Sequence, residues 1–227
     1  YMFNRPLEFT FKYIKKKFKK NPVLIEANQK VLQDGFNYAS NIHAIPNTYR
    51  IEPAKLKKGL YRNINGNQAT SWGVLAAAEK AGLKLFIGSY PITPATGILE
   101  ELALRKDMGV KSLQAEDEIA GICTSIGASF AGRLAVTSTS GPGLALKSEA
   151  LNLAVMTELP LVVIDVQRGG PSTGLPTKTE QSDLWQALYG RNGESPVPVL
   201  AAGTPSDCFR FGFEAAKIAI EHMTPVI

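Results

Sequence analysis

Three acidic residues stand together where a predicted strand gives way to a helix. Glu116, Asp117 and Glu118 follow the segment "VKSLQ", whose pattern predicts a strand. Acids are common in the first turn of a helix because the helix dipole stabilises negative charge there. That explanation suffices for Asp117 and Glu118. Glu116 comes first after the strand, so its carboxyl group could instead enter a crevice and act as an acid or base.

A second candidate is the loop "GSYPITPAT", which follows the predicted strand "KLFIG". Pro91 and Pro94 restrict the backbone around Thr93, so a hydroxyl group is presented from a stiff loop. The competing interpretation is a rigid connection in which Thr93 or Thr96 caps the next helix. Composition alone leaves both interpretations open.

Two further polar segments also follow predicted strands. In "QRGGPSTGLPTKTEQ", Arg168 is a permanent cation suited to capturing a carboxylate or phosphate, and we favour a functional loop over a solvated one. "TSTSGPG" suggests a phosphate cradle at a helix start. It lacks the lysine and hydroxyl ending of a nucleotide P-loop and the dinucleotide fingerprint, so we favour a tight turn into a helix.

The elements that must position these residues alternate from residue 67 onward. The predicted strands are "KLFIG", "VKSLQ", "RLAVTSTS", "PLVVIDV" and "VPVLAA", and "TPVI" resembles the start of another. The predicted helices are "NQATSWGVLAAAEKAG", "ATGILEELALRKDMG", "EDEIAGICTSIGASFAG", "GLALKSEALNLAVMTE", "QSDLWQALYG" and "TPSDCFRFGFEAAKIAIEHM". Gly82 closes the first helix, whereas Thr204 caps the last one and Pro205 enters its first turn.

Such alternation predicts an α/β fold with right-handed crossovers. A mainly parallel sheet covered by helices on both faces gives a three-layer α/β/α arrangement. The four polar segments all follow strands, so we expect them to meet at the carboxyl edge of the sheet, where folds of this kind bind ligands.

The N-terminal part differs from this body in charge. Residues 1–67 hold 13 Lys and Arg against 4 Asp and Glu, whereas residues 68–227 hold 12 against 16. Residues 9–36 are predicted to be helical with a break at Pro22, and residues 39–66 form an irregular linker. The run "KKKFKK" could bind nucleic acid or an anionic membrane. We favour a solvated helix face, since the run is not repeated.

Composition limits the possible classes of protein. The chain has 227 residues, 44% hydrophobic and 20% charged, which is typical of a globular protein. Two cysteines and two histidines, none in a metal-type spacing, predict a cytoplasmic protein without a zinc or iron–sulfur site of its own. No apolar run reaches the roughly 20 residues that span a bilayer. The chain starts at Tyr1 and stops at "TPVI", so we expect a longer natural polypeptide.

Taken together, the polar segments resemble a known family. "YPITPAT", "QAEDE", "TSTSGPG" and "QRGGPSTGLPTKTEQSDL" are similar to the alpha subunit of 2-oxoacid:ferredoxin oxidoreductases, most of all the 2-oxoglutarate type. The resemblance implies a thiamine diphosphate pyrimidine-binding domain over residues 67–227, truncated at its C-terminal end. Residues 1–38 then correspond to the helical tail of a truncated gamma domain, joined by the linker 39–66.

The resemblance also implies roles for individual residues. Glu116 matches the carboxylate that hydrogen-bonds N1′ of the cofactor's aminopyrimidine, a role that a pKa raised by burial would suit. Thr93 and Arg168 match residues that hold the 2-oxoacid, and Thr177 matches a further substrate contact. The implied cofactor contacts are Tyr90, Pro91, Ile92 and Thr93, together with Glu116.

The implied activity is oxidative decarboxylation of a 2-oxoacid, with 2-oxoglutarate the first choice, to an acyl-CoA with electrons passed to ferredoxin. In this family the beta subunit binds the diphosphate and magnesium and carries the iron–sulfur cluster. We therefore expect a beta-subunit partner, ferredoxin and CoA acting through the complex, no nucleic acid or membrane partner, and no activity of this chain alone. The alternatives are a pyruvate or branched-chain relative, or a non-catalytic α/β binding module.

Overall fold

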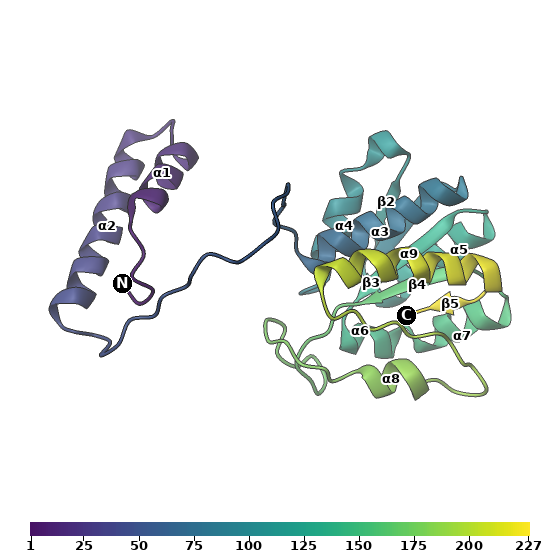
Figure 1. The fold of residues 1–227 in the computed structure, drawn as a ribbon. Coiled ribbons are helices and arrows are strands. Elements are labelled where there is room, and N and C mark those ends of the chain that lie inside the picture. The colour runs from purple at the N-terminus through teal and green to yellow at the C-terminus, as the bar shows by residue number, and fades with distance from the viewer. The chain divides into compact units, whose positions relative to one another are not determined.

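The computed structural model describes residues 1–227, which form two compact units. The first unit is Tyr1–Tyr61 and the second is Arg62–Ile227 (Figure 1). None of the helices combines the length and apolarity that crossing a membrane requires. Each unit is a separate folded body with its own elements.

A pair of helices makes up the first unit. They are α1 (Glu8–Lys17) and α2 (Pro22–Asn41). Asn21 caps α2 by accepting a hydrogen bond from the backbone N–H of Leu24 at 3.2 Å, and Pro22 occupies the first helical position, where its missing N–H costs nothing. The predicted helical segment and its interruption at Pro22 are therefore confirmed.

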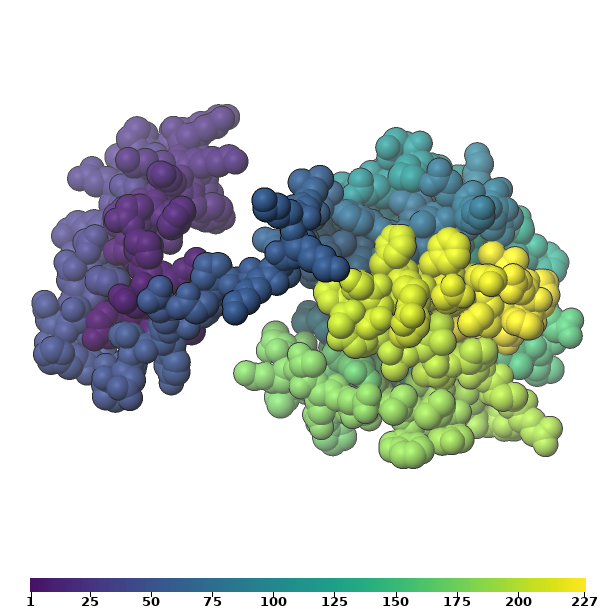
Figure 2. All heavy atoms as spheres, in the orientation of Figure 1, coloured from purple at the N-terminus to yellow at the C-terminus, as the bar shows by residue number.

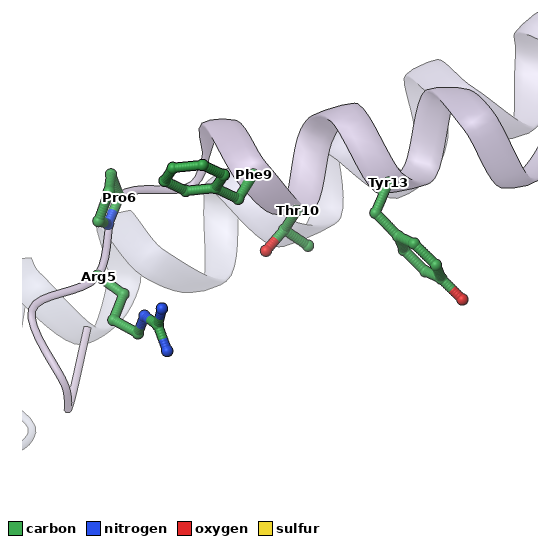
Figure 3. A pocket seen from close by; sticks show the side chains of 5 residues that line it. All are labelled: Arg5, Pro6, Phe9, Thr10 and Tyr13. Atoms are coloured by element: carbon green, nitrogen blue, oxygen red, sulfur yellow. The ribbon is translucent and has the colours of Figure 1, made fainter. Parts of the chain in front are cut away.

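A shallow hollow lies at the start of α1. Figure 3 shows its lining residues, which are Arg5, Pro6, Phe9, Thr10 and Tyr13. Phe9 and Tyr13 are largely exposed, and the lysines of residues 12–20 are all exposed as well. No carboxylate lines the hollow, so it cannot supply the acid or base predicted for this chain.

Five parallel strands form the centre of the second unit. In sheet order they are β2 (Lys111–Gln114), β1 (Leu85–Ser89), β3 (Leu134–Thr139), β4 (Leu161–Asp165) and β5 (Pro225–Val226). The register pairs Phe86 with Lys111 on one side and with Ala135 on the other. Because all pairs are parallel, every strand ends at the same edge of the sheet.

Helices cover both faces of the sheet (Figure 1). One face carries α3 (Gly66–Ala81), α4 (Thr96–Ala103) and α9 (Pro205–His222), and a short 3₁₀ helix, η1 (Lys106–Met108), follows α4. The other face carries α5 (Glu118–Phe130), α6 (Gly141–Leu146), α7 (Ser148–Met156) and α8 (Leu184–Tyr189). The predicted three-layer α/β/α architecture is confirmed.

The two faces bury separate apolar cores. Successive side chains of a strand point to opposite faces. In β3, Leu134 and Val136 accordingly pack with α3, α4 and α9, whereas Ala135 packs with α5 and α7. Every residue of this central strand is buried. At the edge, all four residues of β2 are exposed.

The predicted strand at residues 197–202 is wrong. Pro196 and Pro198 have no N–H to donate to a ladder, so the segment cannot pair regularly. Only two backbone hydrogen bonds form there, from Leu200 N–H to the carbonyl oxygen of Ile227 and from Ile227 N–H to that of Pro198. The fifth strand comes instead from "TPVI", as its pattern indicated.

Two predicted helices are shorter or divided in the structure. The helix predicted from "ATGILEELALRKDMG" ends at Ala103, and η1 then leads to Gly109 in the left-handed conformation. The helix predicted from "GLALKSEALNLAVMTE" is split into α6 and α7 at Lys147. Gly82 and Thr204 cap α3 and α9 as expected.

Helices α3 and α9 approach each other through glycines. A Cβ atom on Gly73 would lie 2.2 Å from the backbone oxygen of Phe209, and one on Gly212 would lie 2.9 Å from that of Thr70. Backbone atoms cannot move aside as the end of a flexible side chain can. The packing of α3 on α9 therefore requires a residue without a side chain at position 73.

We expect Gly73→Ala to lower the free energy of unfolding of the chain by about 1–3 kcal/mol, because the methyl group forces the two helices apart. Urea unfolding followed by circular dichroism measures the change. Gly127→Ala in α5 is the matched control, since its Cβ meets nothing within 4 Å. Alanine at that position should stabilise the chain by roughly 0.5–1 kcal/mol. Equal effects of the two variants would contradict the packing account.

Candidate active site at the carboxyl edge of the sheet

Arg168 and Thr93 meet at the carboxyl edge although 75 positions separate them. The guanidinium Nη1 of Arg168 donates a hydrogen bond to the backbone oxygen of Thr93 at 2.8 Å. Arg168 is only 7% exposed, and its Nε is buried without a hydrogen-bond partner. The Thr93 side chain remains exposed. The site thus holds a fixed cation with spare donor capacity beside an accessible hydroxyl group.

The long loop after β4 folds back on its own beginning. Ser182 donates its hydroxyl hydrogen to the backbone oxygen of Arg168 at 2.7 Å, and Gly169 N–H donates to the backbone oxygen of Lys178 at 2.8 Å. These bonds fix the main chain of Arg168, and the contact with Thr93 fixes its side chain. Thr177 lies in the same loop, where it is exposed and its hydroxyl makes no hydrogen bond within the chain. Figure 2 shows the segment between β4 and α9 at the surface.

Tyr90 is buried where the segment after β1 meets the end of β3. Its hydroxyl group lies 2.9 Å from the Thr139 hydroxyl in a shared hydrogen bond. Burial raises the pKa of Tyr90 above its usual range, so the phenol stays protonated. A Cβ atom on Gly143 would lie 2.1 Å from the Tyr90 hydroxyl oxygen. This glycine of "TSTSGPG" is thus required by packing, which supports a tight turn rather than a phosphate cradle.

Glu116 lies between β2 and α5, outside both elements. Its side chain is exposed and makes no hydrogen bond within the chain. The residues on either side are held in place: Ala115 N–H donates to the backbone oxygen of Ser89 at 2.7 Å, and Asp117 caps α5 by accepting from Ala120 N–H at 2.8 Å. The backbone around Glu116 is therefore fixed, and its carboxyl group is available to bind another molecule.

Lys147 is a member of this region that sequence reasoning missed. Its side chain is fully buried, and its Nζ donates to the backbone oxygen of Glu118 at 2.8 Å and to the Thr137 hydroxyl at 3.1 Å. Burial lowers the pKa of Lys147 to about 8, while the nearby carboxylates act in the opposite direction. One feature of the sequence does indicate burial of Lys147: it lies at helical spacing from Leu144 and Leu151, which are both buried.

A pair of carboxyl groups joins β4 to the end of the long loop. The carboxyl groups of Asp165 and Asp183 lie close enough to influence each other's titration, and Gln167 Nε2 donates to Asp183 Oδ1 at 3.0 Å. One oxygen of each acid is buried without a hydrogen-bond partner. Burial raises the pKa of Asp165, and the nearby Asp183 carboxyl raises it further. The pair therefore holds a proton that separate aspartates would release.

The edge can hold one half of a thiamine-type cofactor. Glu116 would offer a carboxyl group to a ring nitrogen, and the spare donor of Arg168 suits a carboxylate. No group of three or more His, Cys, Asp and Glu side chains lies close enough to bind a metal ion. These residues fit the pyrimidine ring of the cofactor and a 2-oxoacid, whereas they provide no metal ligands for a diphosphate.

The fold defines a parallel α/β domain with a candidate ligand site at its carboxyl edge. Residues 76–227 match the family described as pyruvate flavodoxin/ferredoxin oxidoreductase, thiamine diphosphate-binding. This chain belongs to that family.

Similar proteins support the same assignment. The chain is 58% identical over 227 residues to the 2-oxoglutarate oxidoreductase subunit KorA of Mycobacterium tuberculosis, covering 100% of this chain and 35% of that protein. It is 46% identical over 165 residues to the 2-oxoglutarate synthase subunit KorA of Archaeoglobus fulgidus, covering 72% of this chain and 46% of the relative.

A solved structure shares the fold over the whole chain. The 2-oxoglutarate:ferredoxin oxidoreductase from Magnetococcus marinus, with 2-oxoglutarate, coenzyme A and succinyl-CoA bound, matches with a TM-score of 0.76 and 39% identity. The match covers 100% of this chain and 39% of the other. The chain thus spans between a third and a half of the length of the relatives it matches.

We expect Asp165→Asn to stabilise the chain at pH 8. The pKa of Asp165 is raised in the folded state, so folding loses stability as pH rises from the unfolded-state pKa through the folded one. An amide at that position donates to Asp183 without a titrating proton. The gain at pH 8 should be roughly 1–3 kcal/mol and should be smallest near pH 4, where the wild-type acid is already about half protonated in the unfolded state.

Urea unfolding at pH 4, 6 and 8 measures this dependence. Asp107→Asn, at an exposed position in η1, serves as the control for removal of a negative charge. An Asp165→Asn variant that is destabilised at pH 8, or equally affected at all three pH values, would show that the pair holds no proton.

Proposed function

We propose that this chain forms the pyrimidine-binding part of the alpha subunit of a thiamine diphosphate-dependent 2-oxoacid:ferredoxin oxidoreductase. The reaction is oxidative decarboxylation of a 2-oxoacid, with 2-oxoglutarate as the preferred substrate, to an acyl-CoA with electrons passed to ferredoxin. The observation that carries the proposal is the contact between Arg168 and Thr93, with a donor of Arg168 left over. The family assignment supports the cofactor.

Glu116 acts on the cofactor ring in this proposal. When bound, thiamine diphosphate supplies a nucleophilic carbon and an electron sink for decarboxylation. The carboxyl group of Glu116 would hold N1′ of the aminopyrimidine through a hydrogen bond and would exchange a proton with that atom. Its fixed backbone supports this role, because a catalytic acid or base must lie within hydrogen-bonding reach of its proton. Tyr90, Pro91 and Ile92 would line the site beside the ring.

Arg168 and the hydroxyl residues bind the substrate. The guanidinium group pairs with the carboxylate of the 2-oxoacid, and Thr93 donates from the stiff loop to the 2-oxo end. The exposed hydroxyl group of Thr177 provides a further contact. Since Arg168 is buried against Thr93, its charge remains unscreened by water and is attracted strongly to an anion.

A second subunit completes the site. All four residues of β2 are exposed, Leu113 by 39%, and Ile119, three residues after Glu116, is 51% exposed. We assign this exposed edge strand, with the apolar side chains of Leu113 and Ile119, to contact with a beta subunit, which supplies the diphosphate and magnesium site and the iron–sulfur cluster. Ferredoxin and CoA then act through the complex. The two free cysteines fit a reducing compartment, and we place the protein in the cytoplasm.

The preference for 2-oxoglutarate follows from the relatives. Two of them, from Mycobacterium tuberculosis and Archaeoglobus fulgidus, carry 2-oxoglutarate in their names. The similar solved structure contains 2-oxoglutarate itself. Identity of 39–58% with these proteins over this whole chain or most of it favours the same substrate over pyruvate or a branched-chain 2-oxoacid.

Glu116→Gln should abolish most of the turnover of the complex assembled from full-length alpha and beta subunits. An amide binds a ring nitrogen but cannot exchange a proton with it, so we expect kcat to fall by about 10²–10⁴-fold. Reduction of a viologen dye with 2-oxoglutarate and CoA measures the rate. Glu149→Gln, at an exposed position in α7, is the control and should leave the rate unchanged. Near-normal turnover of Glu116→Gln would remove the assigned role.

Arg168→Lys should weaken substrate binding. Lysine keeps the positive charge but loses the planar fork, so we expect KM for 2-oxoglutarate to rise by about 10-fold or more.

The same dye assay with 2-oxoglutarate, pyruvate and 2-oxoisovalerate compares kcat/KM for the three acids in the wild-type complex. We expect 2-oxoglutarate to give the highest value. A higher value for either other acid would reassign the substrate.

A further inference from the structure

Lys147 joins three segments of the site through a single buried ammonium group. Its Nζ donates to the backbone oxygen of Glu118 at the start of α5 and to the hydroxyl group of Thr137 in β3. The same atom lies 5.1 Å from the centre of the Tyr90 ring, which is within the range of a cation–π interaction. Lys147 therefore connects α5, β3 and the segment after β1.

The hydrogen bond from Lys147 holds the backbone of Glu118, two residues after Glu116, whose carboxylate is proposed to act on the cofactor. Glu116 is flanked on one side by the hydrogen bond from Ala115 to Ser89 and on the other by the hydrogen bond from Lys147 to Glu118. Its own side chain makes no hydrogen bond that would set its direction. The place of its carboxyl group therefore depends on how the backbone is held at Ala115 and at the start of α5, where Asp117 caps the helix and Lys147 ties it to β3.

An ammonium group at this position is costly and is not needed for packing. Leu144, Leu151 and Ala154 occupy the same stripe of α6 and α7, and all three are buried among apolar residues. A methionine could fill the position without removing a charge from water. The hydrogen bonds that only a polar group can make to α5 and β3 account for the lysine.

We propose that Lys147 is a positioning residue that fixes Glu116 by anchoring the first turn of α5 to β3. The inference rests on the proposed function of Glu116. Gly121 supports it, because a Cβ atom there would lie 3.5 Å from the Lys147 Nζ and 3.3 Å from the Ser89 Cα. The helix thus leaves room for the ammonium group at the point where α5 passes over β1.

The test compares two variants, each of which removes a side chain that holds one end of α5. Lys147→Met removes the attachment at the N-terminal end, whereas Ser129→Ala removes the hydrogen bond from Ser129 to the backbone oxygen of Pro160 near the C-terminal end. In the assembled complex, we expect Lys147→Met to lower kcat by about 10–100-fold with KM for 2-oxoglutarate changed less than threefold. Ser129→Ala should leave kcat within twofold of wild type.

A double-mutant cycle separates positioning from general destabilisation. If Lys147 acts through Glu116, Lys147→Met should lower kcat no further in a complex that already carries Glu116→Gln. Multiplication of the two effects, or a kcat of Lys147→Met within threefold of wild type, would overturn the proposal. A Ser129→Ala variant as slow as Lys147→Met would overturn it too, because any loose α5 would then suffice.

A milder variant keeps the test decisive if Lys147→Met does not assemble. Thr137→Val has nearly the same shape and removes one of the two acceptors, so we expect kcat to fall by about threefold or more, and only when Glu116 is intact. An unchanged kcat would overturn the proposal. If Glu116→Gln itself keeps full turnover, the proposed function of that residue fails. If Glu116→Gln loses turnover and Lys147→Met does not, only the positioning role fails.

Discussion

Parallel strand pairing is the constraint on which the site depends. Because β1, β2, β3 and β4 all run in one direction, the segments that follow them leave the sheet at one edge. Residues far apart in the chain are thereby brought together, as the hydrogen bond from Arg168 to Thr93 shows most clearly. An antiparallel strand in the centre of the sheet would move one of these segments to the opposite edge.

The edge is rich in groups that are expensive to bury. Arg168, Lys147 and Asp183 all lie almost out of contact with solvent, and each is held by at least one hydrogen bond. Some hydrogen-bonding groups remain unsatisfied, since Arg168 Nε and one oxygen of Asp183 have no partner. Buried polar atoms without partners cost free energy unless a ligand or a proton satisfies them. This cost is consistent with a site built for binding rather than for stability alone.

The sequence was sufficient for the architecture and for part of the site. Alternating apolar strands and amphipathic helices predict the three layers, and polar loops after the strands predict the edge at which Arg168 and Thr93 meet. The strand at residues 197–202 was misassigned because β propensity was weighed without the missing N–H groups of Pro196 and Pro198. Lys147 was missed because lysines are rarely buried, and the partners that make burial possible lie on other elements.

The most direct test of the account is an electron cryo-microscopy structure of the assembled complex with thiamine diphosphate and 2-oxoglutarate. The account predicts a carboxyl oxygen of Glu116 within about 2.6–3.2 Å of the aminopyrimidine N1′, with the Arg168 guanidinium against the substrate carboxylate. A cofactor ring bound elsewhere, with Glu116 facing solvent and Arg168 away from the substrate, would contradict it.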